Sequence, residues 1–245
     1  METRLTHIEK ERDARIIFAC ESGSRAWGFA SPDSDYDVRF LYTKPLSWYL
    51  SVSDKRDTID ILDGDFDAVG WELRKSLILL KKSNIPALEH LFSPIIYRAE
   101  EDLLVELRAI ATDCFSPIAS MFHYLSMSKK YEEKIVEDTV KLKSLFYALR
   151  TAMAGKWILE CGTMPPVRFR EMLPLVTKEV ADEIEELMRI KSENAEKYMH
   201  DRPEKVCDFI SEVIATNDTY AKTLSGGKPD TERINHFLHK YVTVP

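Results

Sequence analysis

The 245-residue sequence lacks long apolar segments. It contains no run of about 18 apolar residues, which is the length that a membrane-crossing helix needs. The N-terminal stretch METRLTHIEKERDAR is polar and charged, and it has no apolar core of the kind found in secretory signals. We therefore expect a cytoplasmic protein that has no membrane partner.

Cysteine is scarce and scattered. The four cysteines stand singly, with no CxxC pair and no histidine at a zinc-ligand spacing. This pattern indicates neither a disulfide framework nor a structural zinc site. We expect all four to be buried small apolar residues: Cys20, Cys114, Cys161 and Cys207.

Basic residues are outnumbered by acidic ones, and the formal net charge is −7. Nonspecific coating of nucleic acid depends on neutralising phosphates with Lys and Arg, so this balance argues against it and leaves room only for a local basic cleft. The chain is 44% hydrophobic and 31% charged, which is typical of a globular protein with one large or two small domains.

The first half of the chain shows β-strand patterns. Apolar residues 14–20 and the alternating segment 35–42 each predict a strand, and segments 56–62 and 66–71 predict a hairpin around Asp63-Gly64. Leu73, Leu77 and Leu80 then mark a helix that ends near Pro86.

From about Ser116 the apolar spacing is helical and predicts no further strand. Ser116-Pro117 is a favourable helix start, and helices are expected over 138–160, 178–199 and 204–220 and after Asp230. The predicted fold class is α+β: a small mixed β-sheet domain with flanking helices over 1–110, followed by an all-helical domain over 111–245.

The segment CESGSRAWGFASPDSDYDVRF contains the residues that suggest a catalytic function. Side chains two apart on a strand point to the same face, so Asp35 and Asp37 can hold one or two Mg²⁺ ions. A glycine turn at Gly23-Ser24 exposes backbone N–H groups and a hydroxyl to a triphosphate. A metal site beside a phosphate cradle indicates phosphoryl or nucleotidyl transfer.

Several motifs together resemble a known family. Gly23 to Phe29 (GSRAWGF), Ser34 to Phe40 (SDYDVRF) and Trp71 to Lys75 (WELRK) are similar to the predicted nucleotidyltransferases associated with RNA ligases, within the DNA polymerase β-like superfamily. The resemblance covers about residues 15–170. It implies the minimal nucleotidyltransferase fold, a requirement for Mg²⁺ or Mn²⁺, and an NTP as donor, but it does not imply the acceptor.

The superfamily places a third carboxylate on a later strand, and Asp67 is our choice for it. Asp67 lies in the strand that leads into the helix near Glu72, whereas Asp63 and Asp65 suit the turn itself. If Asp63-Gly64 forms a two-residue loop, Asp60 lies opposite Asp67 and is the reserve. The predicted catalytic and metal-binding residues are Asp35, Asp37 and Asp67.

Phosphate contacts are expected from Gly23, Ser24 and Arg25, although Arg25 could equally pair with Glu21 or Asp33. Arg39 shares the strand face of the aspartates, and a role as their counter-charge is favoured over one as a substrate ligand. The family resemblance also indicates one helix face that closes over the nucleotide or acceptor, which would otherwise be merely solvated: Lys143, Tyr147 and Arg150.

Three functions of different classes remain open. The first is a metal-dependent nucleotidyltransferase that moves a nucleoside monophosphate from an NTP to a hydroxyl acceptor such as RNA. The second is an antitoxin-like or signalling module that nucleotidylates a partner protein. The third is a non-catalytic nucleotide-binding domain, which the retained aspartates disfavour.

Overall fold

The computed structural model describes residues 1–242 and contains two compact units. The first, which we call the sheet unit, comprises Met1–Ala26, Asp35–Phe115 and the segment from Lys228. The second, the helical unit, comprises Trp27–Ser34 and Ser116–Gly227. The short segment 27–34 therefore clusters with helices that are far from it in the sequence. A division into domains between residues 110 and 111 stays a prediction.

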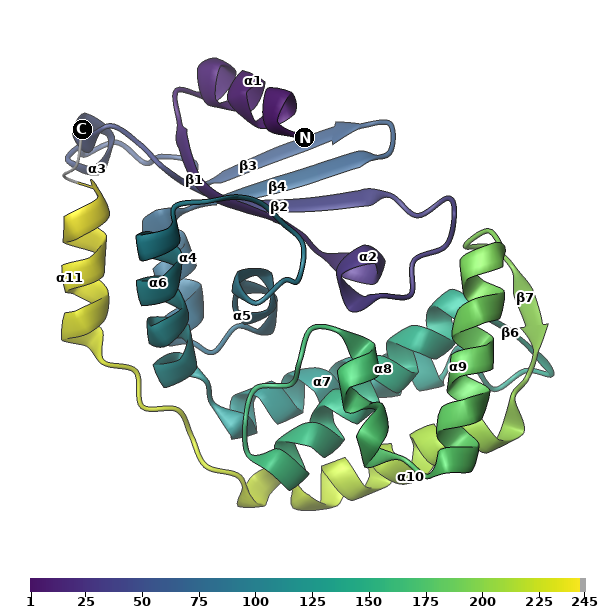
Figure 1. Ribbon diagram of the computed structural model, residues 1–245. Helices are drawn as coiled ribbons and strands as arrows, with labels where there is room; N and C mark the ends of the chain where they lie inside the picture. The colour runs from purple at the N-terminus through teal and green to yellow at the C-terminus, as the bar shows by residue number, and fades with distance from the viewer. Residues whose placement is uncertain (243–245) are drawn as a thin grey trace. The chain divides into compact units, whose positions relative to one another are not determined.

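The sheet unit is built on a five-stranded mixed sheet with the order β3-β4-β2-β1-β5 (Figure 1). Strands β2 and β4 are parallel, while the other neighbouring pairs are antiparallel. Because β2 and β4 run in the same direction, both begin at the same end of the sheet. The strands are β1 Arg15–Glu21, β2 Tyr36–Thr43, β3 Thr58–Asp63, β4 Phe66–Glu72 and β5 Ile96–Ala99.

Helix α1 (Glu2–Arg12) covers one face of this sheet (Figure 1). Leu5 and Ile8 are its buried residues, and they join a core cluster that includes Ile16, Val38 and Phe40. Burying these side chains supplies the apolar contact that holds a helix of otherwise polar composition on the sheet.

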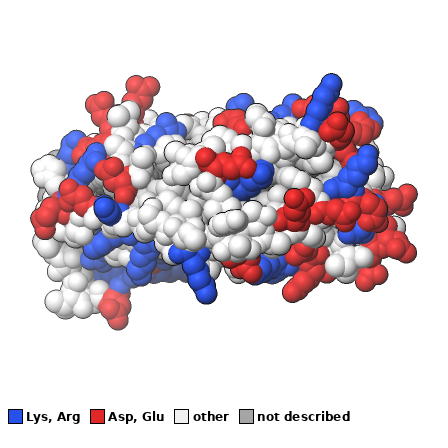
Figure 2. Space-filling view, turned by 90° about the horizontal axis from the view of Figure 1, so that it is seen from below, with Lys and Arg blue, Asp and Glu red and all other residues white. Residues whose placement is uncertain are grey.

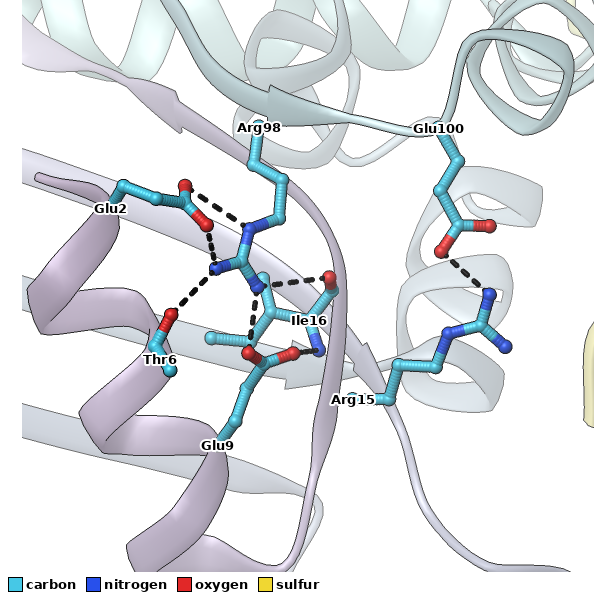
Figure 3. Close-up of polar contacts among 7 residues, drawn as sticks. All are labelled: Glu2, Thr6, Glu9, Arg15, Ile16, Arg98 and Glu100. Atoms are coloured by element: carbon cyan, nitrogen blue, oxygen red, sulfur yellow. Dashed lines mark hydrogen bonds and ion pairs between the residues drawn. The ribbon is translucent and has the colours of Figure 1, made fainter. Parts of the chain in front are cut away.

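Polar contacts also fasten α1 to the sheet at Arg98 of β5 (Figure 3). The Arg98 guanidinium binds Glu2 and lies 2.9 Å from the Glu9 carboxylate. Glu9 in turn accepts a 2.7 Å hydrogen bond from the backbone N–H of Ile16 in β1. The first helix is therefore tied to two strands.

The remaining helices of the sheet unit begin at recognisable caps. The Glu72 carboxylate accepts hydrogen bonds from the N–H groups of Arg74 and Lys75 at the start of α4, and Asn84 caps α5 with Pro86 in its first turn. Helices α4, α5 and α6 lie on the side of the sheet opposite α1 (Figure 1). The helices are α2 Gly23–Trp27, α3 Leu46–Tyr49, α4 Leu73–Lys81, α5 Ile85–Leu91, α6 Glu101–Cys114 and α11 Thr231–Val242.

The helical unit is organised around α8 (Leu142–Cys161), which packs against α7 and α10. Its predicted apolar stripe is buried, with Leu145, Leu149 and Met153 fully covered. Ser116 caps α7 as expected, since its side chain accepts from the N–H of Ala119. The other elements are α7 Pro117–Glu132, β6 Thr139–Lys141, η1 Phe169–Leu175, α9 Lys178–Glu193, β7 Met199–Asp201, α10 Glu204–Tyr220 and η2 Ala221–Thr223.

The α+β class is confirmed, with three differences in detail. The second half is not entirely helical, because β6 and β7 pair as a short two-stranded sheet. Strand β5, which has no alternating pattern, was not expected and forms the edge beside β1. Cys161, the last residue of α8, is exposed rather than buried, because the helix ends there at Gly162.

Surface charge is mixed. The face shown in Figure 2 carries acidic and basic side chains near one another rather than a broad basic surface. Across residues 1–242, no helix combines the length and apolar character that crossing a bilayer requires.

Candidate active site

Asp37 and Asp67 are neighbours at the end of the sheet where β2 and β4 begin. The parallel register places Asp37 of β2 beside Asp67 of β4. The guanidinium of Arg39 joins them: its Nη2 lies 3.1 Å from Oδ1 of Asp37 and 3.2 Å from Oδ2 of Asp67. Two of the three predicted acids are thus brought together, with the predicted counter-charge between them.

Asp60 lies elsewhere in the hairpin. The two-residue loop is Gly64-Asp65, because Asp63 pairs with Phe66, so the predicted Asp63-Gly64 loop is wrong. This register places Asp60 opposite Val69 rather than Asp67. Asp60 is ion-paired with the exposed Arg56. The geometry favours Asp67 over Asp60, although the role of either residue stays a prediction.

Asp35 is exposed and precedes β2, which begins at Tyr36 rather than at Asp35 as expected. Its backbone carbonyl accepts a 3.0 Å hydrogen bond from Nε of Arg25. The Arg25 guanidinium also lies 4.2 Å from the centre of the Tyr36 ring. Arg25 therefore holds the chain at the point where it enters β2.

Gly23 and Ser24 form the start of the short helix α2 rather than a free turn. Gly23 has a φ of 62°, in the left-handed region that favours glycine. A Cβ atom at this position would lie 2.2 Å from Oδ2 of Asp37. The absence of a side chain thus leaves room for the Asp37 carboxylate, while Ser24 is largely buried.

Glu21 supports the backbone at Asp37, a role that was not predicted from the sequence. Its carboxylate is fully buried and accepts a 2.9 Å hydrogen bond from the backbone N–H of Asp37 and another from the hydroxyl of Tyr97. Burial raises the pKa of Glu21 above its usual range, although these two hydrogen bonds act in the opposite direction.

The position of Glu21, a charged residue at the end of an otherwise apolar strand segment, could have indicated this role from the sequence. The sequence around Tyr97 offers no comparable sign. Together the two residues fix the backbone that carries Asp37.

The donor set suits a divalent cation in its chemistry. Carboxylate oxygens are hard ligands of the kind that Mg²⁺ and Mn²⁺ prefer, and Asp37 and Asp67 present them side by side. Within residues 1–242, no three His, Cys, Asp or Glu side chains are gathered closely enough to hold a metal ion. The cation that Asp37 and Asp67 face in this state is the guanidinium of Arg39.

The predicted nucleotide-binding residues of α8 lie in the helical unit and differ in exposure. Arg150 is buried, and its guanidinium lies 4.3 Å from the centre of the Trp27 ring. Tyr147 meets the same ring edge-on, with centres 5.1 Å apart. Lys143 is exposed and lies 2.5 Å from the Glu196 carboxylate. Their contact with a nucleotide stays a prediction.

The loop before Asp35 is anchored within the helical unit. Oε1 of Glu196 accepts a 2.9 Å hydrogen bond from the Ser34 hydroxyl, and the Glu196 N–H donates to Oδ1 of Asp33 at 2.8 Å. The ammonium of the buried Lys191 donates to the Ser31 hydroxyl at 2.8 Å. Burial lowers the pKa of Lys191. Segment 31–34 is therefore ordered by polar contacts with α9 and the residues after it.

Comparisons with known proteins match nearly the whole chain. The model of a family described as RlaP, RNA repair pathway DNA polymerase beta family, matches residues 1–240. A Bacillus subtilis (strain 168) protein described as uncharacterized protein YcgL is 40% identical over 239 residues, which are 96% of this chain and 92% of that protein. The crystal structure of a nucleotidyltransferase-like protein from Exiguobacterium sibiricum 255-15 is similar with a TM-score of 0.32 and 12% identity, over 98% of this chain and 79% of that one. The family match therefore spans the sheet unit and the helical unit.

Proposed function

This chain belongs to the RNA repair pathway DNA polymerase beta family, as its motifs predicted, and on that premise we propose that it transfers a nucleoside monophosphate from an NTP to a hydroxyl group of RNA. The family description supports RNA as the acceptor. Nucleotidylation of a partner protein and nucleotide binding without catalysis are the two alternatives.

The observation that carries this proposal is the position of Asp37 beside Asp67, with Gly23 against Asp37. Two adjacent carboxylates provide metal ligands, and the absence of a side chain at Gly23 leaves room for the carboxylate of Asp37 in this position.

In this mechanism the protein positions the substrates and neutralises negative charge. Divalent cations, when bound, would lower the pKa of the attacking hydroxyl and offset the charge of the triphosphate. Asp35 and Asp37 would hold the cation on the triphosphate, and Asp67 would complete the ligand set for the one at the acceptor. Glu21 keeps the Asp37 backbone in place.

Ser24 and Arg25 would contact the phosphates beside Gly23. Arg25 already binds the backbone carbonyl of Asp35, so its guanidinium is held next to the proposed metal ligands. Its fixed, delocalised positive charge suits a phosphate oxygen.

The test is transfer of label from each α-³²P-labelled NTP to total RNA in the presence of Mg²⁺. We expect labelled RNA with the parent protein, and at least about a 100-fold loss with Asp37→Asn, because the carboxylate would be a metal ligand. The control Asp63→Asn removes an exposed carboxylate at the end of β3 and should leave transfer unchanged. Calorimetry should also show loss of Mg²⁺-ATP binding in Asp35→Asn and Asp37→Asn.

Other results would select an alternative. Label on a protein instead of RNA would indicate the nucleotidylating module. Binding of Mg²⁺-ATP without label transfer to either acceptor would indicate a non-catalytic domain.

A further inference from the structure

Arg39 is held more tightly than a surface counter-charge requires. Its Nη2 is shared between the Asp37 and Asp67 carboxylates at 3.1 and 3.2 Å, as described above. Its Nη1 donates to the backbone carbonyls of Val38 and Asp67, both at 3.0 Å. Only 18% of the Arg39 side chain is exposed.

Two of these contacts are made to the carboxylates that would also hold a divalent cation. Asp37 and Asp67 are about two-thirds buried, with exposed fractions of 30% and 36%, so their mutual repulsion is less screened than at an open surface. The guanidinium offsets that repulsion. A cation bound by both carboxylates would take up the negative charge that Nη2 now faces, so the two positive charges compete for the same pair of carboxylates.

We propose that Arg39 is the counter-ion of this site. Its guanidinium keeps Asp37 and Asp67 in place when no metal is bound and competes with a divalent cation for these two carboxylates. The proposal rests on the proposed function, since that function supplies the cation. The two contacts of Nη1 are with backbone carbonyls and do not involve the carboxylate groups. They can therefore keep the guanidinium nearby after Nη2 has moved away from a carboxylate. Arg39 is in this sense a positioning residue.

One consequence concerns the order of binding. A cation alone must displace a charged group without compensation, whereas a cation that arrives with a triphosphate brings negative charge that Arg39 can face instead. The free protein should therefore bind a divalent cation weakly, and nucleotide should strengthen that binding.

The experiment measures the binding of Mn²⁺ alone by electron paramagnetic resonance of the free ion. We expect Arg39→Gln to bind Mn²⁺ at least about tenfold more tightly than the parent, because the competing charge is gone. Arg39→Lys should lie between them, since an ammonium keeps the charge but lacks the planar fork whose two nitrogens contact the carboxylates and the backbone carbonyls. The control Arg56→Gln removes the exposed guanidinium beside Asp60 and should not change Mn²⁺ affinity.

The sign of the effect separates this role from a purely structural one. If Arg39 only stabilises the strands, both Arg39 variants will bind Mn²⁺ no better than the parent, and the inference is overturned. Circular dichroism and urea unfolding establish that each variant is folded; if Arg39→Gln is not, then Arg39→Lys alone decides, and affinity no higher than that of the parent overturns the inference.

The same variants distinguish this inference from the function on which it rests. If the parent labels RNA but Arg39→Gln does not gain Mn²⁺ affinity, only the inference fails. If the parent binds neither Mn²⁺ nor Mg²⁺-ATP, the proposed function fails as well.

Discussion

Gly23 and Asp37 are so close that a Cβ atom on Gly23 would lie 2.2 Å from Oδ2 of Asp37 and 3.0 Å from its Cγ. No real Cβ atom tolerates the first distance, so a side chain at position 23 would push the carboxylate aside. The φ of 62° at Gly23 adds a second requirement for glycine.

We expect Gly23→Ala to lower stability and to abolish Mg²⁺-ATP binding, since the carboxylate of Asp37 would be displaced. Gly64→Ala is the matched control, because Gly64 has a φ of 61° and open space around its Cβ position. Backbone strain alone costs about 1 kcal/mol, so Gly64→Ala should lose about that much stability and still bind nucleotide. Urea unfolding and calorimetry measure the two effects. Equal nucleotide binding by both variants would contradict the proposed role of the contact.

A second prediction concerns Asp67, which lies beside Asp37, and Asp60, which pairs with Arg56. If Asp67 holds the cation that activates the acceptor, Asp67→Asn should keep NTP affinity nearly intact but reduce turnover by about 100-fold or more. Such a loss corresponds to about 2.7 kcal/mol of transition-state stabilisation. Asp60→Asn should resemble the parent in both respects.

Pyrophosphate release measured for both variants decides between the two acids. An inactive Asp60→Asn beside an active Asp67→Asn would reverse the assignment. A matched loss of nucleotide affinity and turnover in Asp67→Asn would instead assign Asp67 to the cation on the triphosphate.

The sequence was sufficient for those parts of the fold that have strong local patterns. The apolar run of β1, the capped start of α7 at Ser116 and the apolar stripe of α8 all appear as predicted. Strands β5 and β6 were missed because each is short and exists only through a partner: β5 pairs with β1, and β6 pairs with β7, which lies far along the chain. Local propensity carries no information about such pairing.

For the candidate site, the structure brings together two of the predicted acids, Asp37 and Asp67, but the register of the hairpin differs from the predicted one. A loop of Asp63-Gly64 and a loop of Gly64-Asp65 are both common, yet they differ in whether Asp60 or Leu62 faces Asp67. The support that Glu21 and Tyr97 give Asp37 depends on a contact between residues 76 positions apart, which no local pattern indicates.

A third prediction compares two arginines that Figure 3 shows near α1 and β5. Arg98 has 18% of its side chain exposed and is bound by two carboxylates, whereas the Arg15–Glu100 pair is 46% and 38% exposed. We expect Arg98→Ala to lower the free energy of unfolding by about 1–2 kcal/mol, since it leaves the partly buried Glu9 without its ion-pair partner. Arg15→Ala should change it by less than about 0.5 kcal/mol, because exposed pairs contribute little. Urea unfolding at low salt tests both, and similar losses for the two variants would count against the argument from burial.

The last prediction concerns pH and Glu196 in the helical unit. Burial raises the pKa of Glu196, but the hydrogen bonds from Lys143 and Ser34 outweigh it, so the net pKa lies below the usual value of 4.5. The other charged groups facing it are Lys191 and Asp33. A lowered folded-state pKa means that the ionised form contributes stability, which is complete above about pH 4.5 and is lost as the pH falls through the folded-state value.

Glu196→Gln should therefore be less stable than the parent by about 1 kcal/mol at pH 7, and the difference should shrink as the pH falls below about 4.5. Lys143→Met removes the main partner and should show a loss in the same pH window. Urea unfolding of the three proteins from about pH 7 to about pH 3.5 measures the difference directly. The sign is decisive, because a carboxylate whose pKa was raised in the folded state would make the substitution stabilising at pH 7. A difference between parent and Glu196→Gln that does not change with pH would mean that the loop at residues 31–34 is held by the shape of this side chain rather than by its charge.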